Sequence, residues 1–144
     1  MSSHRCIFCK IAKGDDPKTT ILFQDDEIVV FKDRKPATSH HYLVVPKSHK
    51  TDAKSLGADD IQLVNTLVSV GNRVLEENGG QVSDALMGFH WPPFHSISHL
   101  HLHVISARQD MGWIARGIFR PNTLWFVTVE WLLDRLTKMK NNIE

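Results

Sequence analysis

One run of alternating histidine and apolar residues constrains this chain more than any other feature. Residues 98–105 read SHLHLHVI, so polar and apolar side chains alternate with a period of two. That period is typical of an extended strand, whose successive side chains point to opposite faces. The pattern predicts a strand over 98–106 with its leucines and valine in a core and His99, His101 and His103 in a row on the opposite face. Such a row could surround one small anion.

The histidine-rich region extends beyond this run, because His90 and His95 precede it in a chain that holds nine histidines in total. A half-exposed strand with histidines by chance is one interpretation, but β-branched or charged residues would serve there equally well. A catalytic metal site is another, since His-x-His offers two ligands, yet no carboxylate nearby supports it clearly. Nucleophilic catalysis is favoured: a neutral imidazole attacks an electrophile while its neighbours carry protons near pH 7.

Length and charge indicate one domain over residues 1–144, with a core over about 6–137 and a fraying, flexible tail at 138–144. Lys and Arg number 17 against 16 Asp and Glu, a net charge of +1, so nucleic acid is not the expected partner. The chain has no apolar run long enough to span a membrane and no hydrophobic core of a secretory signal. These features predict a cytoplasmic protein without a membrane partner.

The order of the predicted elements favours an α+β domain with a mainly antiparallel sheet, one long helix and a short C-terminal helix. The long helix covers 59–78, with Asp59 available as its cap and Gly79 just beyond its end. A short helix is expected near 6–13 and another at 130–139. The expected strands cover 27–32, 41–45, 83–89, 98–106 and 123–129.

The residues His99-x-His101-x-His103-Val104-Ile105 resemble the His-φ-His-φ-His-φ-φ signature of the histidine triad (HIT) superfamily of nucleotide hydrolases and transferases. The family's C-x-F-C-K-I, F-K-D-x-x-P and H-Y-L-V-V-P-K-x-H segments occur in order at 6–11, 31–36 and 41–49. Residues 87–104 are most similar to the Hint branch. The resemblance implies a HIT-like fold and an enzyme that cleaves the P–N bond of adenosine 5'-phosphoramidates and releases AMP.

The resemblance also implies catalytic roles. His101 would be the nucleophile that becomes nucleotidylated, and His103 would stabilise charge on the phosphate oxygens. His99 is the first residue of the triad, and His41 matches a fourth histidine that supports the nucleophile. Ser96 would donate a hydrogen bond to the leaving amine, although an ordinary turn hydroxyl is the alternative.

The nucleotide site implied by the resemblance centres on Asp33, which would hold the ribose hydroxyls unless it is only a turn cap. Arg34 replaces a more usual apolar residue, and its guanidinium plane could stack on the base. Phe94, His95 and Ser96 stand where other Hint proteins carry Gly-Gln-Ser, so backbone contacts to phosphate can survive while the glutamine contact cannot. The expected nucleotide-binding residues are Asp33, Arg34, Phe94, His95, Ser96, His101 and His103.

The pair Cys6 and Cys9 has the C-x-x-C spacing of half a zinc site. The family sometimes completes such a site with the histidine of P-K-x-H, here His49, and a further histidine, His99. The expectation is a structural zinc, with two reduced buried thiols as the alternative. No cofactor is expected to be required for catalysis.

Two alternative functions remain open from the sequence. The GFHxxPxxSxSHxHLHVIS pattern is also similar to aprataxin, a deadenylase of 5'-adenylated nucleic-acid ends, and a nucleotide sensor without turnover would use the same pocket. The expected ligand is a purine nucleoside monophosphate or phosphoramidate. The resemblance further implies a homodimer that meets through the helix from Asp59 and the strand after it, and a location in the cytoplasm and also the nucleus.

Overall fold

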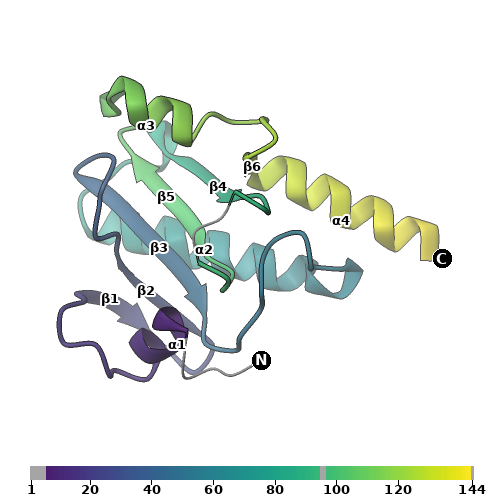
Figure 1. Ribbon diagram of the computed structural model, residues 1–144, viewed down its shortest axis with the longest axis horizontal. Helices are drawn as coiled ribbons and strands as arrows, with labels where there is room; N and C mark the ends of the chain where they lie inside the picture. The colour runs from purple at the N-terminus through teal and green to yellow at the C-terminus, as the bar shows by residue number, and fades with distance from the viewer. Residues whose placement is uncertain (1–5, 95–96, 144) are drawn as a thin grey trace.

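The computed structural model describes residues 6–94 and 97–143. Its strands form one six-stranded antiparallel sheet in the order β1-β2-β3-β5-β4-β6 (Figure 1). The strands are β1 (Ile21–Gln24), β2 (Ile28–Lys32), β3 (His40–Pro46), β4 (Leu86–His90), β5 (Leu102–Ser106) and β6 (Phe126–Thr128). The helices are α1 (Ile7–Ala12), α2 (Ile61–Glu77), α3 (Trp113–Ile118) and α4 (Val129–Ile143).

The central strand β3 separates two cores because its side chains alternate between the faces of the sheet. Tyr42 and Val44 join the larger core, which α2 covers. Leu43 and Val45 join a smaller core around Phe8 of α1 on the opposite face. Figure 1 shows α1 in front of the sheet and α2 behind it. Position 41 therefore shares the α1 face.

The histidine-containing run follows the predicted alternation of faces. Leu100, Leu102 and Val104 lie in the core under α2, as expected. Gly71 allows α2 to approach closely, since a Cβ there would lie 3.1 Å from a Val104 methyl group. The predicted strand over 98–106 is too long, because β5 begins only at Leu102. The preceding segment leaves the sheet, and the N–H of Leu100 bonds the carbonyl of Lys50 at 2.6 Å.

Most other predicted elements are present with shifted ends. Gly79 follows α2 with a φ of +89°, as a helix-ending glycine does. Asp59 is not the cap: the carboxylate of Asp60 accepts the N–H of Gly57 at 2.9 Å, and Asp60 precedes the first residue of α2. The strand expected at 83–89 begins at Leu86, because residues 82–84 form a 3₁₀ turn. Strand β1 and helix α3 were not predicted.

The C-terminal part of the chain closes one edge of the sheet. Strand β6 pairs with β4, and Gly88 is required there because a Cβ would lie 2.4 Å from the carbonyl oxygen of Val127. Strand β4 pairs with β5 through residues 86–88 on one edge and with β6 through residues 88–90 on the other. The C-terminal helix is not short: α4 has 15 residues and continues through most of the segment expected to fray.

Across residues 6–94 and 97–143, no helix is both long enough and apolar enough to cross a bilayer.

Candidate active site

A cavity of about 160 Å³ lies between α1 and the sheet. Apolar side chains of α1, β2 and β3 form most of its wall, and His101 and His103 lie in its lining. A slot of this kind can take a flat apolar ring and a polar group together. The lining residues are Ile7, Phe8, Ile11, Thr19, Phe31, Lys32, Asp33, Arg34, Leu43, Ile97, His101 and His103.

His101 has its protonation pattern set by the backbone. Its Nδ1 lies 2.7 Å from the carbonyl oxygen of His99, so Nδ1 carries the proton that this bond needs. The Nε2 atom of the neutral ring then keeps its lone pair. Burial lowers the pKa of His101 to about 4, which leaves the imidazole uncharged at neutral pH. His101 therefore has the electronic state of a nucleophile.

A chain of hydrogen bonds sets the remaining imidazoles. The N–H of Ala37 donates to Nδ1 of His41 at 2.9 Å, so the proton of His41 sits on Nε2. That Nε2 lies 2.9 Å from Nδ1 of His103, which must then accept. The proton of His103 is consequently on Nε2, 3.2 Å from Nδ1 of His90. One backbone amide thus selects the tautomer of each ring in turn.

His90 is the site residue to which the sequence interpretation gave no role. It ends β4, and its Nε2 lies 3.3 Å from the carbonyl oxygen of Ile118. The phenyl ring of Phe119 packs against His41, His90 and His103, with ring centres 5.0 to 5.3 Å apart. The histidine count of the region was the available signal for His90. Phe119 had none, because it lies well beyond every recognised segment.

Burial also lowers the pKa of His41 and His103. For His103 the neighbouring imidazoles add to the effect, and its pKa lies well below the usual value. The carboxylate of Asp33 partly opposes the shift at His41. Because His41 is therefore uncharged near pH 7, and its Nε2 proton is directed at His103, the 3.3 Å separation between Nε2 of His41 and the carboxylate of Asp33 is a close polar contact rather than an ion pair.

Asp33 and Arg34 both line the cavity, as expected for nucleotide contacts. Asp33 also caps a turn, since its second oxygen accepts the N–H of Lys35 at 2.8 Å. The two interpretations of this residue are therefore compatible. Arg34 pairs with Asp16, whose carboxylate also accepts the Thr19 hydroxyl at 2.7 Å. That pair holds the guanidinium beside the cavity wall.

Other predicted residues lie elsewhere. His99 does not line the cavity, which corrects the expectation of three histidines around one anion. The side chain of Phe94 is outside the cavity lining and 57% exposed. Ser96 and His95 lie outside the described residues. His40 bonds the Tyr42 hydroxyl at 2.7 Å on the α2 face, which leaves His41 as the histidine of this strand that belongs to the site.

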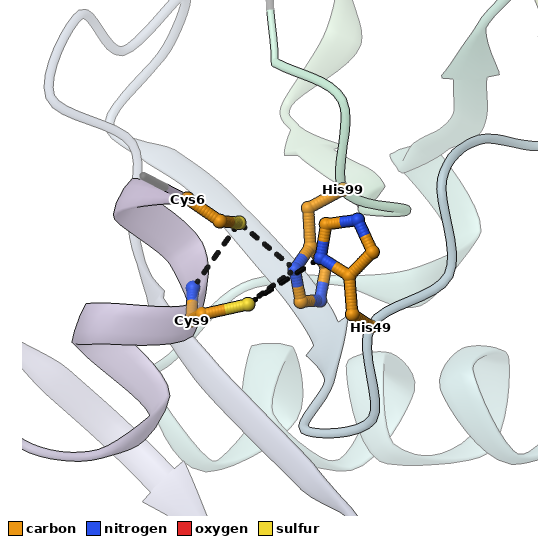
Figure 2. Close-up of side chains that lie close together, drawn as sticks. All are labelled: Cys6, Cys9, His49 and His99. Carbon is orange, nitrogen blue, oxygen red and sulfur yellow. Dashed lines mark hydrogen bonds between the residues drawn. The ribbon is translucent and has the colours of Figure 1, made fainter. Parts of the chain in front are cut away.

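A second cluster joins the four residues predicted to hold a metal. Figure 2 shows Cys6 and Cys9 from α1 facing His49, from the loop after β3, and His99, from the segment before β5. Nδ1 of His99 lies 3.2 Å from the sulfur of Cys6 and 3.4 Å from that of Cys9. Nδ1 of His49 lies 3.4 Å from the sulfur of Cys9. All four donor atoms lie within 4.8 Å of one another.

This donor set fits a tetrahedral zinc ion. Zn–S bonds of about 2.3 Å and Zn–N bonds of about 2.05 Å place sulfur and nitrogen roughly 3.6 Å apart, close to the separations found here. The ring of His99 is oriented for it, because Nε2 donates to the carbonyl of Pro46 at 2.8 Å and leaves the Nδ1 lone pair toward the thiols. Burial raises the pKa of the Cys9 thiol to about 11. A bound cation would act in the opposite direction, because it favours the thiolate over the thiol.

A second group, Asp33, His41 and His103, also brings three donor atoms together. His41 and His103 are already hydrogen-bonded to each other in the imidazole chain, and the carboxylate of Asp33 lies 3.3 Å from Nε2 of His41. The cluster is therefore assigned to the chain that fixes the tautomers.

The fold is that of a histidine triad protein, and the chain belongs to this superfamily: the family model described as "Scavenger mRNA decapping enzyme C-term binding" matches residues 5–118. Within the superfamily the chain is HINT3-like. It is 46% identical over 132 residues to "Adenosine 5'-monophosphoramidase HINT3" of Xenopus tropicalis, which covers 91% of this chain and 86% of that relative.

Two further comparisons bear on the predictions. A HIT family hydrolase from Legionella pneumophila superposes with a TM-score of 0.68 at 30% identity, over 75% of this chain and 96% of the other. The predicted HIT-like α+β fold is confirmed. Aprataxin of Ciona intestinalis is 33% identical over 92% of this chain, but the match covers only 33% of that relative.

Proposed function

We propose that this protein hydrolyses the P–N bond of adenosine 5'-phosphoramidates, of the AMP-amine or AMP-lysine type, and releases AMP. The observation that carries the proposal is the state of His101: a neutral, buried imidazole in the wall of the cavity, with Nδ1 protonated against the His99 carbonyl and Nε2 left as the nucleophile. The HINT3 relative that is 46% identical to the chain carries the corresponding activity in its name.

The proposed reaction has two transfers. Nε2 of His101 attacks the α-phosphorus, the P–N bond breaks, and the amine departs after taking a proton from solvent, giving a nucleotidyl-histidine. The ring then carries a positive charge because Nδ1 keeps its proton, and the His99 carbonyl at 2.7 Å accepts from that cation. A water oxygen attacks the same phosphorus next and gives a proton back to solvent, the Nε2–P bond breaks with its electron pair returning to the ring, and AMP leaves. Neither step needs a metal ion.

The other site residues support these transfers. His103 lies beside His101, with ring centres 5.0 Å apart, and stabilises charge on the phosphate oxygens by sharing its Nε2 proton between them and Nδ1 of His90. His41 fixes that tautomer through its 2.9 Å bond. Asp33 holds the ribose hydroxyls and Arg34 borders the base. Ser96 and His95 lie outside the described residues; their proposed roles as donor to the leaving amine and phosphate neighbour rest on the family resemblance alone.

The test is the substitution His101→Ala. We expect AMP release from an adenosine 5'-phosphoramidate to disappear while the fold and much of the affinity for AMP persist. The histidine–phosphorus bond of this intermediate hydrolyses in acid but persists in alkali. The reaction of a substrate labelled in its phosphate is therefore quenched rapidly at alkaline pH, and labelled protein is measured. His40→Ala, on the opposite face, is the matched control. The proposal would be refuted if His101→Ala released AMP at the wild-type rate. It would also be refuted if the wild type released AMP rapidly but no labelled protein could be recovered.

The alternative functions have distinct outcomes in the same experiment. An aprataxin-like deadenylase would prefer adenylated DNA ends over the phosphoramidate, and a sensor would bind AMP-amines without releasing AMP. The net charge of +1 and the higher identity to HINT3, 46% against 33% for aprataxin, favour the phosphoramidase.

We also propose that Cys6, Cys9, His49 and His99 hold a structural zinc ion. When bound, the ion supplies tetrahedral cross-linking between α1, the loop after β3 and the segment before β5. Metal analysis of protein prepared without chelator should find close to one equivalent. Less than about a tenth of an equivalent would refute the site.

The remaining proposals concern assembly and location. We propose a homodimer whose contact includes α2 and the strand after it, β4, part of each edge of which is paired within the chain. Gel filtration with light scattering across a range of concentrations tests the dimer; a monomer at every concentration contradicts it. We propose a cytoplasmic and nuclear location, which imaging of a tagged chain tests; exclusive retention in mitochondria or in the secretory pathway would oppose it.

A further inference from the structure

We propose that Asp16, Thr19 and Arg34 form a polar edge at the end of the cavity away from the histidines, and that this edge selects a purine with an amino group at C6. Thr19 is the specificity-determining residue among them. The inference deepens the phosphoramidase function proposed above and rests on its nucleotide site. It adds the chemical group on the base that the protein recognises.

The order of the strands determines which part of a nucleotide reaches this edge. Adjacent strands in the order β1-β2-β3-β5 lie about 4.8 Å apart. His103 lies on β5, whereas Asp33 and Arg34 directly follow β2. Thr19 stands two positions before β1, at the edge of the sheet, and all four residues line the cavity. A nucleotide with its phosphate at the histidines and its ribose at Asp33 therefore brings its base to Thr19 and Arg34.

Apolar side chains enclose the faces of the base. Phe8 of α1 and Phe31 of β2 both line the cavity and are both buried, with their rings edge to face and 5.3 Å apart between centres. Ile11 and Leu43 extend this apolar lining. Such a wall can hold the flat ring of any purine, because it offers no hydrogen bond that distinguishes one base from another. Selection between bases therefore requires polar groups at the edge of the ring.

The hydroxyl group of Thr19 can only accept a hydrogen bond from a ligand. Its hydrogen is directed at Oδ2 of Asp16, 2.7 Å away. This bond is the main cause that lowers the pKa of Asp16 below its usual value, so the carboxylate is ionised at neutral pH and has no proton to donate. Oδ1 of Asp16 accepts the backbone N–H of Lys18 at 3.2 Å, which fixes the carboxylate in place. The lone pair of the Thr19 oxygen is what remains for the base.

Arg34 adds donors beside this acceptor. Asp16 also accepts from Nη2 of Arg34, which holds the guanidinium at the cavity wall, and the other N–H groups of the fork can donate. An acceptor next to a donor is the complement of adenine, whose N6 amino group donates and whose neighbouring N7 accepts. Guanine and hypoxanthine carry an oxygen at C6, so two acceptor atoms would face each other at Thr19. The edge therefore favours the amino group.

Binding of nucleoside monophosphates tests the inference without turnover. The probes are AMP, purine riboside 5'-monophosphate, which lacks the amino group, and IMP, which has an oxygen in its place. Calorimetry gives the Kd of each probe for the wild type, Thr19→Val and Thr19→Ser. Thr19→Val keeps the shape of the side chain and removes only the hydroxyl group. Thr20→Val is the matched control, because Thr20 is exposed and lies outside the cavity lining.

In the wild type we expect AMP to bind about 5-fold more tightly than purine riboside 5'-monophosphate, which is the size of one ordinary hydrogen bond. We expect it to bind at least about 10-fold more tightly than IMP, which leaves two acceptors unpaired. Thr19→Val should bind AMP and purine riboside 5'-monophosphate equally, because either change removes the same bond. It should also narrow the gap between AMP and IMP. Thr19→Ser and Thr20→Val should keep the wild-type ratios.

Asp16→Asn changes the direction of the Thr19 hydroxyl while leaving Thr19 in place. The amide of the new side chain can donate to the Thr19 oxygen, which frees the hydroxyl hydrogen to turn toward the base. The preference for AMP over IMP should then fall by about 5-fold, since the hydroxyl can donate to the oxygen of IMP.

The inference is overturned if Thr19→Val keeps the wild-type ratio of the Kd values for AMP and purine riboside 5'-monophosphate. It is also overturned if the wild type binds all three probes equally or binds none of them. Should Thr19→Val not fold, an unchanged preference for AMP over IMP in Asp16→Asn overturns it. If the wild type shows the expected ratios but releases no AMP from an adenosine 5'-phosphoramidate, the proposed function is refuted and this inference stands.

Discussion

Replacing His41 by phenylalanine removes the central link of the imidazole chain while keeping a ring of similar size. His41 is 2% exposed and packs edge-on against Phe119, with ring centres 5.3 Å apart, so the phenyl group can occupy the same space. The substitution deletes the acceptor for Ala37 and the donor to His103, both at 2.9 Å. His41→Gln is the matched variant, because its side-chain amide can still donate toward His103.

The magnitude follows from these two bonds. Each buried polar group left without a partner costs about 1–3 kcal/mol, so His41→Phe should lower the free energy of unfolding by about 2–6 kcal/mol. Domains are typically stable by about 5–15 kcal/mol, so the variant remains measurable in most of this range. His41→Gln should lose less. With nothing left to impose its tautomer, His103 can move its proton to Nδ1 and cease to donate to the phosphate; losing one such donor lowers kcat by about 10²-fold.

Urea unfolding at pH 7.5 measures the stability, and single-turnover AMP release measures the chemistry. The order expected for both quantities is wild type, then His41→Gln, then His41→Phe. A His41→Phe protein that releases AMP at the wild-type rate would show that the tautomer chain does not serve catalysis. A loss of less than about 0.5 kcal/mol would show that the two bonds are replaced by others.

Three further outcomes are expected. The free energy of unfolding of chelator-treated protein should decrease as the pH falls below about 6.5. Burial lowers the pKa of His41 and His103 in the folded state, so the unfolded chain binds more protons in this range. A free energy of unfolding that stays constant from pH 5 to 7 contradicts this. Gly88→Ala should lower the free energy of unfolding by about 1–3 kcal/mol, because the added Cβ clashes with β6. Gly117→Ala is the control, since a Cβ there has open space and should change the stability very little. Equal shifts in Tm for the two variants would show that the clash at Gly88 is relieved. Arg34→Ala should raise KM for AMP-amines with kcat unchanged, and an unaltered KM would remove Arg34 from the nucleotide site.

The period of two around the histidines was enough to predict which side chains enter the core. Leu100, Leu102 and Val104 lie under α2 because backbone alternation leaves an extended chain no other choice. The long helix was predictable for a similar reason, since Val64, Leu67 and Leu75 follow helical spacing and are buried. Local periodicity decides such features without knowledge of the rest of the chain.

Periodicity could not assign separate tasks to histidines of one face. His99 turns to the thiols of α1, whereas His101 and His103 line the cavity, and only the docking of a distant helix makes that difference. The role of His90 depends likewise on the pairing of β4 with β5, which places its ring 3.2 Å from His103. Tertiary contacts between residues far apart in sequence determine these features.

The missed elements share weak local signals. Strand β1 has four residues and an irregular register with β2. Helix α3 exposes Trp113, Ile114 and Ile118, so its apolar residues do not mark a buried face. The expectation of a frayed tail followed from the polarity of residues 138–144, but the buried Leu132 and Leu136 anchor α4 one turn earlier and let it continue.

Phe119 and β6 follow the last residue that the family model matches. Phe119 nevertheless packs against the imidazoles of the site, and β6 pairs with the edge of β4. A transcript variant that stopped shortly after position 118 would therefore encode every hallmark histidine while leaving the rings open to solvent and a strand free to recruit other chains. Such a product would look like an enzyme to any signature search but would behave as an inactive, aggregating protein. Surveys of isoforms in this group should consequently score the segment after the hallmark, and not the hallmark alone.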